Sequence, residues 1–262
     1  MSENILEINN LSKYFGGLAA VSDCSIKVKR GTITGIIGPN GSGKTTLFNL
    51  IAGNLKSSGG NVVFDDENIT DVPSYELFSK GLLRTFQIAH EFSNLSVLEN
   101  LMMVPGNQSG EKIMTALFKP GLVAQEEAVV KEKAKEVVEF LNLGHLSNEL
   151  AGNLSGGQKK LLELGRTMMV DAKLVLLDEV GAGVNRTLLK DLGTAIEKLN
   201  KEKGYTFCMI EHDMDFIGRL CDPVIVMAEG SVLFEGSVED AKKDEKVIES
   251  YLGRGSKIKD HN

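Results

Sequence analysis

Residues 38–45 read Gly-Pro-Asn-Gly-Ser-Gly-Lys-Thr and fit the pattern G-x-x-x-x-G-K-[ST] at every fixed position. Glycines in such a loop let the backbone curl, so that successive amide groups point at phosphate oxygens. The side chain of Lys44 then reaches the β and γ phosphates of a nucleotide, and the hydroxyl of Thr45 binds Mg²⁺. The spacing therefore predicts a phosphate-binding loop (P-loop). Its nucleotide-binding residues are Gly38, Pro39, Asn40, Gly41, Ser42, Gly43, Lys44, Thr45 and Thr46.

The segments on either side of the loop have the character that this chemistry requires. Residues 32–37 form an apolar run typical of a buried strand, and residues 46–52 have the composition of a helix. A phosphate on the N-terminus of a helix meets unpaired amide groups and the favourable end of the helix dipole. A glycine turn without function is the alternative, and the strand and helix together argue against it.

A second chemical group follows the apolar residues 174–177, where Asp178 and Glu179 stand next to each other. The run is typical of a buried strand that delivers acids at its carboxyl end, where ligands bind in open α/β sheets. Beside a P-loop, Asp178 is expected to hold Mg²⁺, directly or through water, and Glu179 to polarise the attacking water. Taken alone, the pattern also fits an ordinary strand that ends in a solvated turn.

The stretch Leu-Ser-Gly-Gly-Gln at residues 154–158 precedes an expected helix. Two glycines and a serine at a helix start can form a second anion-binding nest. The same residues also fit an ordinary helix in which Ser155 is the N-cap. From the residue types alone, both interpretations remain open.

Strand and helix patterns alternate along most of the chain, which predicts an α/β protein with a mostly parallel sheet. In residues 24–29, Ile26 and Val28 alternate with polar residues, so one face of that strand is expected to contact water. From about residue 92 to residue 151 the pattern changes to helices and loops, which indicates a helical subdomain inserted into an α/β core. Within it we expect a helix over 125–141 and an irregular excursion over 105–121. The other expected strands are residues 5–8, 62–64, 174–177, 205–210 and 224–227.

Composition restricts the setting in which this chemistry operates. The chain has 262 residues, 42% of them hydrophobic, which is enough for a sizeable core, and its formal net charge of −7 argues against a nucleic-acid partner. No apolar run approaches the roughly 20 residues needed to cross a bilayer. The acidic start lacks a signal-peptide pattern, and the three cysteines lack metal-binding spacing. We expect a cytoplasmic chain that can still dock on a membrane protein.

Further motifs follow one another in a fixed order around these groups. Phe15 precedes two glycines, Gln87 ends the run Arg-Thr-Phe-Gln, and His212 lies in Ile-Glu-His-Asp. Taken singly, each has an ordinary interpretation as a core aromatic, a polar strand end or a structural histidine. Together with Leu-Ser-Gly-Gly-Gln and residues 182–185, they make the whole chain resemble the ATP-binding cassette (ABC) proteins.

The resemblance implies a role for each motif. Phe15 would stack on adenine, Gln87 would contact the γ-phosphate and Mg²⁺, and His212 would hold the geometry of the γ-phosphate. With Lys44 and Glu179, the residues Gln87 and His212 form the expected catalytic set. ABC cassettes work as head-to-tail dimers with two ATP molecules between them, so each subunit caps the ATP of the other. The capping residues that this chain would contribute are Ser155, Gly156, Gly157 and Gln158.

The resemblance also implies the fold. It predicts a single ABC ATPase domain over 1–262, in which a P-loop NTPase (RecA-like) α/β core carries an antiparallel β subdomain and an inserted α-helical subdomain. The core would occupy about residues 1–88 and 152–237, and the helical subdomain about 89–151. A C-terminal helix and tail would follow over about 238–262.

Five stretches resemble one branch of the family, the ATP-binding subunits of importers for branched-chain amino acids. They are residues 13–21, 83–87, 95–101, 210–214 and 247–253. This branch implies permease subunits in the membrane, a second cassette subunit that is identical or different, and indirectly a periplasmic or extracellular solute-binding protein. The chain would lie on the inner face of the cell membrane. Urea or amide importers share nearly all the motifs, lipopolysaccharide-export ATPases are also related, and a non-transport ABC ATPase is a further alternative.

The chain departs from the family pattern at two positions. Val180 stands where a proline usually follows the two acids, and Asn185 replaces the usual aspartate of residues 182–185. Shortly after Gln87, Phe92 and Leu95 are apolar residues at positions i and i+3. They would either seal the helical subdomain onto the core or line a groove for a short helix of the permease. The resemblance favours the groove.

Overall fold

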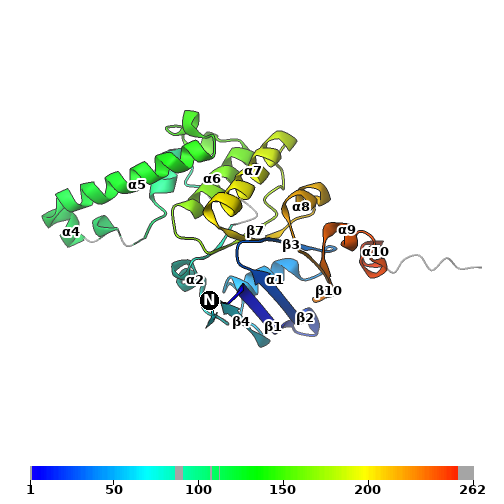
Figure 1. Ribbon diagram of the computed structural model, residues 1–262. Coiled ribbons are helices and arrows are strands. Elements are labelled where there is room, and N and C mark those ends of the chain that lie inside the picture. Colours follow the sequence, from blue (N-terminus) through cyan, green and yellow to red (C-terminus); the bar gives the residue numbers. More distant parts are fainter. Residues whose placement is uncertain (1, 86–90, 107, 112, 253–262) are drawn as a thin grey trace, which may run out of the picture. The chain divides into compact units, whose positions relative to one another are not determined.

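The computed structural model describes residues 2–85, 91–106, 108–111 and 113–252 (Figure 1). The chain divides into two compact units. The core unit comprises residues 1–84, 173–179 and 197–262, and the helical unit comprises residues 85–172 and 180–196. The helical unit thus includes residues 85–88, 152–172 and 180–196 in addition to the range 89–151 expected from the sequence.

The main sheet of the core unit has six strands in the order β10 (Ser231–Gly236), β9 (Val224–Ala228), β3 (Ile33–Ile37), β8 (Thr206–Ile210), β7 (Leu174–Asp178) and β6 (Leu82–Arg84). Neighbouring strands are parallel, except that β9 and β10 are antiparallel. β3, β7 and β8 are buried along their whole length, as expected of parallel strands covered on both faces. Because parallel strands end at one edge of a sheet, the segments after β3, β7 and β8 share that edge.

A second sheet of the core unit is antiparallel, in the order β2 (Leu18–Lys29), β1 (Asn4–Phe15), β4 (Gly59–Phe64) and β5 (Glu67–Asn68). The first two strands are longer than the sequence pattern predicts, because each continues to the turn at Gly16, which has a left-handed φ of +60°. The predicted alternation in β2 is confirmed: Ile26 and Val28 are buried, while the residues between and beside them are exposed.

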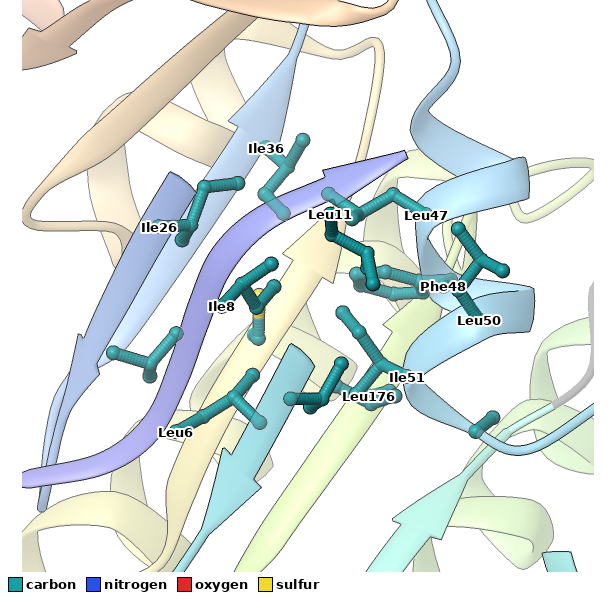
Figure 2. Packing of buried hydrophobic residues seen from close by; sticks show 14 of the residues in the cluster. Leu6, Ile8, Leu11, Ile26, Ile36, Leu47, Phe48, Leu50, Ile51 and Leu176 are labelled. Atoms are coloured by element: carbon teal, nitrogen blue, oxygen red, sulfur yellow. The ribbon is translucent and has the colours of Figure 1, made fainter. Parts of the chain in front are cut away.

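The apolar faces of both sheets pack on helix α1 (Lys44–Ile51), which follows the P-loop (Figure 2). Leu6 and Ile8 of β1 belong to one buried apolar cluster together with Phe48 of α1 and Leu176 of β7. The packing fixes α1, and with it the P-loop, at the carboxyl edge of the main sheet. The other helices of the core unit are α2 (Ser74–Lys80), α8 (Met214–Leu220), α9 (Val238–Ala241) and α10 (Glu245–Leu252).

The helical unit contains α3 (Val97–Met102), α4 (Ile113–Phe118), α5 (Pro120–Phe140) and α6 (Gly156–Met168), with short 3-10 turns at Ser109–Glu111, Gly144–Leu146 and Ala151–Asn153. A further helix, α7 (Arg186–Lys203), begins in the helical unit and ends in the core unit. Ala134, Val137 and Val138 of α5 are buried, at the i, i+3 and i+4 spacing of one helix face. Among the described residues, no helix is both long and apolar enough to span a bilayer.

The prediction of an irregular excursion over residues 105–121 is wrong. This range contains the turn at Ser109–Glu111, the whole of α4 and the first residues of α5. The six residues of α4 lie between the glycine- and proline-rich parts of the range, so those breakers do not interrupt the helix. Pro120 occupies the first turn of α5, where its fixed φ favours a helix start and its missing amide hydrogen costs nothing.

Candidate nucleotide-binding and catalytic site

The loop between β3 and α1 has a backbone that requires glycine at two positions. Gly38 and Gly43 have φ angles of +147° and +99°, which side chains of L-residues rarely adopt. A Cβ atom on Gly38 would lie 2.1 Å from the carbonyl oxygen of Met227, and one on Gly43 would lie 2.4 Å from that of Ala20. The curl of the loop therefore depends on the glycines of the sequence pattern.

Lys44 opens α1 and is only 6% exposed. Its ammonium group donates hydrogen bonds to the carbonyl oxygens of Gly38, at 2.9 Å, and Pro39, at 3.0 Å. Burial lowers the pKa of Lys44, while the negative charges of Glu179 and Asp178 act to raise it. The ammonium group of Lys44 thus lies within electrostatic reach of both carboxylates at the carboxyl end of β7.

A cavity of about 410 Å³ opens beside the P-loop, and all its lining residues belong to the core unit. Its volume is in the ordinary range of small-molecule sites. The cavity brings together the P-loop, Phe15, Glu179 and His212, which lie far apart in the sequence. Gly38 and Pro39 are the P-loop residues that do not line it. The lining is Phe15, Leu18, Ala19, Ala20, Asn40, Gly41, Ser42, Gly43, Lys44, Thr45, Thr46, Glu179 and His212.

Glu179 and His212 contact each other directly at one side of this cavity. Nε2 of His212 lies 2.9 Å from Oε1 of Glu179. Each residue follows a strand of the main sheet, β7 and β8 respectively, and the amide of Glu179 donates to the carbonyl oxygen of Ile210 at 2.9 Å. Glu179 has a left-handed φ of +49°, which is unusual for a residue with a side chain and concentrates at functional sites.

Asp178 is buried, with a side chain that is 5% exposed, and does not line the cavity. Its Oδ2 accepts a hydrogen bond of 2.6 Å from Nη2 of Arg84, the last residue of β6. Nη1 of the same guanidinium donates to Oδ1 of Asn49 on α1, also at 2.6 Å. The carboxylate is therefore held at the end of β7 by a cation from the neighbouring strand.

The donor set of this site suits Mg²⁺. Among the described residues, no cluster of three or more His, Cys, Asp or Glu side chains could hold a metal ion. Mg²⁺, however, commonly takes only one or two protein oxygens and completes its shell with water and substrate phosphates. The hydroxyl of Thr45, which is exposed, and the carboxylate of Asp178 are oxygen donors of that kind.

Phe15 ends β1 at the mouth of the cavity and is 49% exposed. The ammonium group of Lys13 lies 5.2 Å from the centre of its ring, within the range of a cation–π contact. The second ring face of a half-exposed aromatic can stack on a planar base. This placement differs from that of a core aromatic.

In the helical unit, Ser155 is the N-cap of α6, as the structural interpretation of Leu-Ser-Gly-Gly-Gln predicts. Its hydroxyl accepts from the amide of Gln158 at 3.4 Å, while Oε1 of Gln158 accepts from the amide of Ser155 at 2.9 Å. Ser155 and Gly156 are exposed, whereas Gly157 is buried. A Cβ on Gly157 would lie 2.5 Å from Cδ1 of Leu188, so α6 approaches the first turn of α7 closely.

The two departures from the family pattern have local structural roles. Val180 is buried, with 4% exposure. Asn185 precedes α7, and its Oδ1 accepts a hydrogen bond of 2.9 Å from the amide of Leu188. An N-cap of this kind is favoured by asparagine and aspartate alike, so the replacement preserves the helix start.

Gln87 and the other residues from 86 to 90 lie outside the described residues. Phe92, which follows them, is 48% exposed, and the guanidinium of Arg166 lies 5.7 Å from its ring centre. Buried Asn100 holds the backbone of Phe92 from both sides: it accepts from the amide at 2.8 Å and donates to the carbonyl at 3.1 Å. Both contacts lie within the helical unit.

Sequence reasoning missed Arg84 and Asn100 as positioning groups. A signal existed for each, because Arg84 ends an apolar strand and Asn100 stands among the apolar residues of a short helix. A polar group in such a place is usually buried and paired. The sequence does not name the partner, since that depends on which strands and loops become neighbours.

A glycine-dependent P-loop, two neighbouring acids at the carboxyl end of the buried strand β7 and a cavity lined by the loop and by one of these acids define a P-loop ATPase. The ABC transporter family model matches residues 21–182. A probable branched-chain amino acid transport ATP-binding protein LivG of Archaeoglobus fulgidus is 45% identical and covers 95% of both chains. BraF of Pseudomonas aeruginosa, a high-affinity branched-chain amino acid transport ATP-binding protein, is 36% identical over 97% of this chain and 99% of its own.

Solved structures agree with the sequence comparison. A nucleotide-free ATP-binding cassette from an ABC transporter is 40% identical, with a TM-score of 0.82 and coverage of 95% of this chain and 99% of that one. A cassette in its ADP conformation is also 40% identical, with a TM-score of 0.81 and coverage of 96% and 100%. The chain belongs to the ABC transporter family, as one of its ATP-binding cassettes, and this confirms the resemblance, the predicted fold and the ATPase class.

Proposed function

We propose that this chain hydrolyses ATP at the cavity beside its P-loop and thereby energises an importer of branched-chain amino acids. The observation that carries the catalytic part is the single cavity lined by the P-loop, Phe15, Glu179 and His212. In this proposal the base of ATP stacks on Phe15. The loop amides from Asn40 to Thr46 and the ammonium group of Lys44 bind the phosphates.

Hydrolysis of the γ-phosphate needs positioning and charge stabilisation more than covalent chemistry. Glu179 orients the attacking water and accepts its proton. His212, 2.9 Å from Glu179, holds the carboxylate in place and contacts the γ-phosphate from the same side. Mg²⁺, held by Thr45 and Asp178 and with Gln87 as a further proposed ligand, would neutralise charge that develops on the phosphates.

The substitution Glu179→Gln tests this assignment. The amide cannot accept a proton, so hydrolysis is expected to fall by at least about 100-fold, the lower range for general base catalysis. Nucleotide binding should remain, because Lys44, Thr45 and Asp178 are untouched. Phosphate release and retention of labelled ATP are measured on the same sample, and a variant that still turns over ATP at the parent rate removes Glu179 from the role of base.

The cargo and the assembly rest on the relatives. The relatives named above transport branched-chain amino acids by their printed names, and they match this chain over nearly its whole length. We infer two cassette subunits, identical or different, that share two ATP molecules and lie beneath permease subunits on the inner face of the membrane. Outside, a periplasmic or extracellular binding protein would deliver the amino acid. A urea or amide importer is the alternative cargo class.

The cargo test begins with the permease. Membrane proteins that co-purify with the Glu179→Gln chain in Mg-ATP are identified and reconstituted in vesicles with the parent chain. ATP-dependent uptake of labelled leucine is expected, and an excess of urea should not compete with it. Uptake of urea without leucine would assign the chain to the alternative importer.

Phe92 is the residue that we propose for the contact with the permease. Half of its surface is exposed, and Asn100 fixes its backbone, so an apolar group is presented from a rigid loop. Phe92→Ser should weaken co-purification of the permease while ATPase activity without permease and the melting temperature stay near those of the parent. A variant that melts much earlier and still binds the permease would make Phe92 a packing residue only.

A further inference from the structure

The geometry points to Arg84 as a positioning residue for ATP hydrolysis: we propose that it ties the Asp178 carboxylate to α1 and so fixes the spacing between Asp178 and Thr45. This inference rests on the proposed function, because Asp178 and Thr45 are magnesium ligands only within that proposal. Arg84 itself would touch neither nucleotide nor metal.

The guanidinium of Arg84 joins two elements of the core unit. One nitrogen donates to Asp178 at the end of β7, and another donates to Asn49 on α1, both at 2.6 Å. The side chains of Arg84 and Asp178 are 13% and 5% exposed, so water screens the pair weakly. Charge-assisted bonds from a planar fork fix direction as well as distance.

The position of Asn49 makes this bridge relevant to the metal. Asn49 follows Thr45 by four residues in α1, so the two side chains lie on the same helix face one turn apart. Arg84 therefore links the turn beneath Thr45 to the strand end that carries Asp178. The apolar packing of α1 on the sheets, seen at Phe48 in Figure 2, places the helix, and the charge-assisted bonds of Arg84 add a directional link between α1 and β7.

The arrangement also leaves one carboxylate oxygen for the metal. The bond from Arg84 uses Oδ2 of Asp178, and within the part of the chain that the structure describes Oδ1 makes no hydrogen bond.

Arg84 is, in addition, the last residue of the core unit before the chain enters the helical unit. The bridge thus stands directly before the segment that contains Gln87.

A simpler role for Arg84 is to neutralise a buried carboxylate, which requires its charge but not Asn49. Two variants separate the roles. Arg84→Lys keeps the positive charge and loses the fork that reaches both partners. Asn49→Ala leaves the Arg84–Asp178 pair intact and removes only the anchor on α1.

The experiment measures the affinity for a fluorescent ATP analogue in full-length Glu179→Gln chains, as a function of Mg²⁺ concentration and in EDTA. In both variants, the Mg²⁺ concentration for half-maximal enhancement should rise about 10- to 100-fold, as is typical when a residue that orients a metal ligand is lost. Affinity in EDTA should stay unchanged. The double variant should need no more Mg²⁺ for half-maximal enhancement than the more strongly affected single variant, because both changes break the same bridge.

Arg30→Lys is the matched control, because Arg30 forms another partly buried pair with an aspartate of the core unit, Asp65. It should leave the Mg²⁺ dependence unchanged. Unaltered Mg²⁺ dependence in Arg84→Lys and Asn49→Ala, with a clear defect in Asp178→Asn, overturns the inference and keeps the proposed function. No defect in Asp178→Asn removes Asp178 from the metal site, and the inference falls with it. If Arg84→Lys fails to fold, Asn49→Ala alone decides.

Discussion

At the scale of single residues, the ion pair of Glu91 and Lys159 shows how charge is balanced within the helical unit. Nζ of Lys159 lies 2.7 Å from Oε1 of Glu91, whose side chain is only 10% exposed. Burial acts to raise the pKa of Glu91, but the hydrogen bond from Lys159 and further hydrogen bonds outweigh it, so the pKa lies below its ordinary value. The folded state therefore favours the charged carboxylate.

Glu91→Gln is expected to lower the free energy of unfolding at pH 7 by about 1.5–3 kcal/mol, the value of a hydrogen bond to a charged group. A carboxylate whose pKa is lower in the folded than in the unfolded protein stabilises the fold at pH values above the unfolded pKa, which is about 4.3 for glutamate. This contribution is lost as the pH falls through the lower pKa of the folded state. The difference between parent and variant should therefore shrink below about pH 4. Urea unfolding at a series of pH values measures it.

The exposed pair Lys135–Glu132 provides the control. Its side chains are 51% and 68% exposed, so Glu132→Gln should change stability by no more than about 0.5 kcal/mol at pH 7. An equal loss of unfolding free energy in both variants would mean that the buried pair contributes no more to stability than the exposed pair.

Residue types and spacing predict the chemistry of the site better than they predict the geometry of the site. Lys44, Asp178 and Glu179 could be assigned chemical roles because a P-loop beside an acidic strand end allows few alternatives. The contact between His212 and Glu179 and the bridge from Arg84 to Asp178 depend on strands that are distant in sequence and adjacent in the sheet. No local pattern carries that information.

At the scale of elements, the close approach of α6 and α7 depends on Gly157. Gly157→Ala would place a Cβ atom 2.5 Å from Cδ1 and 2.8 Å from Cβ of Leu188. One helix must shift, and a loss of about 1–3 kcal/mol in the free energy of unfolding is expected. Thermal and urea unfolding of the two proteins measure this loss.

Gly156→Ala is the matched control, because the nearest atom to its added Cβ is 3.8 Å away, an ordinary contact. Its stability should lie within about 0.5 kcal/mol of the parent. Adding Leu188→Ala to Gly157→Ala removes Cγ and Cδ1 and should recover part of the loss. Equal stability of the two glycine variants would contradict the steric account.

Elements with a clear period were predicted well, and those without one were not. The alternation of β2 and the helical spacing of Ala134, Val137 and Val138 in α5 identified both elements correctly. The short helix α4 was missed because glycines and prolines on both sides of it suggested an irregular segment. Glycine and proline mark where a helix ends, but they do not exclude a short helix between them.

At the scale of the whole molecule, the proposed composite sites require a second cassette. The chain carries a net charge of −7, so two copies repel each other through their net charge. Mg-ATP shared between a P-loop and the Leu-Ser-Gly-Gly-Gln residues of the partner would overcome this repulsion. Glu179→Gln, which should retain ATP, is therefore expected to sediment as a dimer with Mg-ATP and as a monomer without it.

Adding Lys44→Ala to this variant should keep it monomeric under both conditions, because ATP binding is lost. A monomer of the Glu179→Gln chain in the presence of bound Mg-ATP would contradict self-association and indicate a non-identical partner cassette. Sedimentation at low and high salt separates charge repulsion from a missing contact surface, since salt screens exposed charges.

The left-handed backbone of Glu179 affects how this protein can be stabilised in the laboratory. A side chain in that conformation costs roughly 1–2 kcal/mol relative to glycine. Directed evolution that selects only for survival on heating would therefore favour glycine at this position. The improved protein would have lost the acid that we propose as the base. A thermostable library of this chain needs an activity screen at the same step.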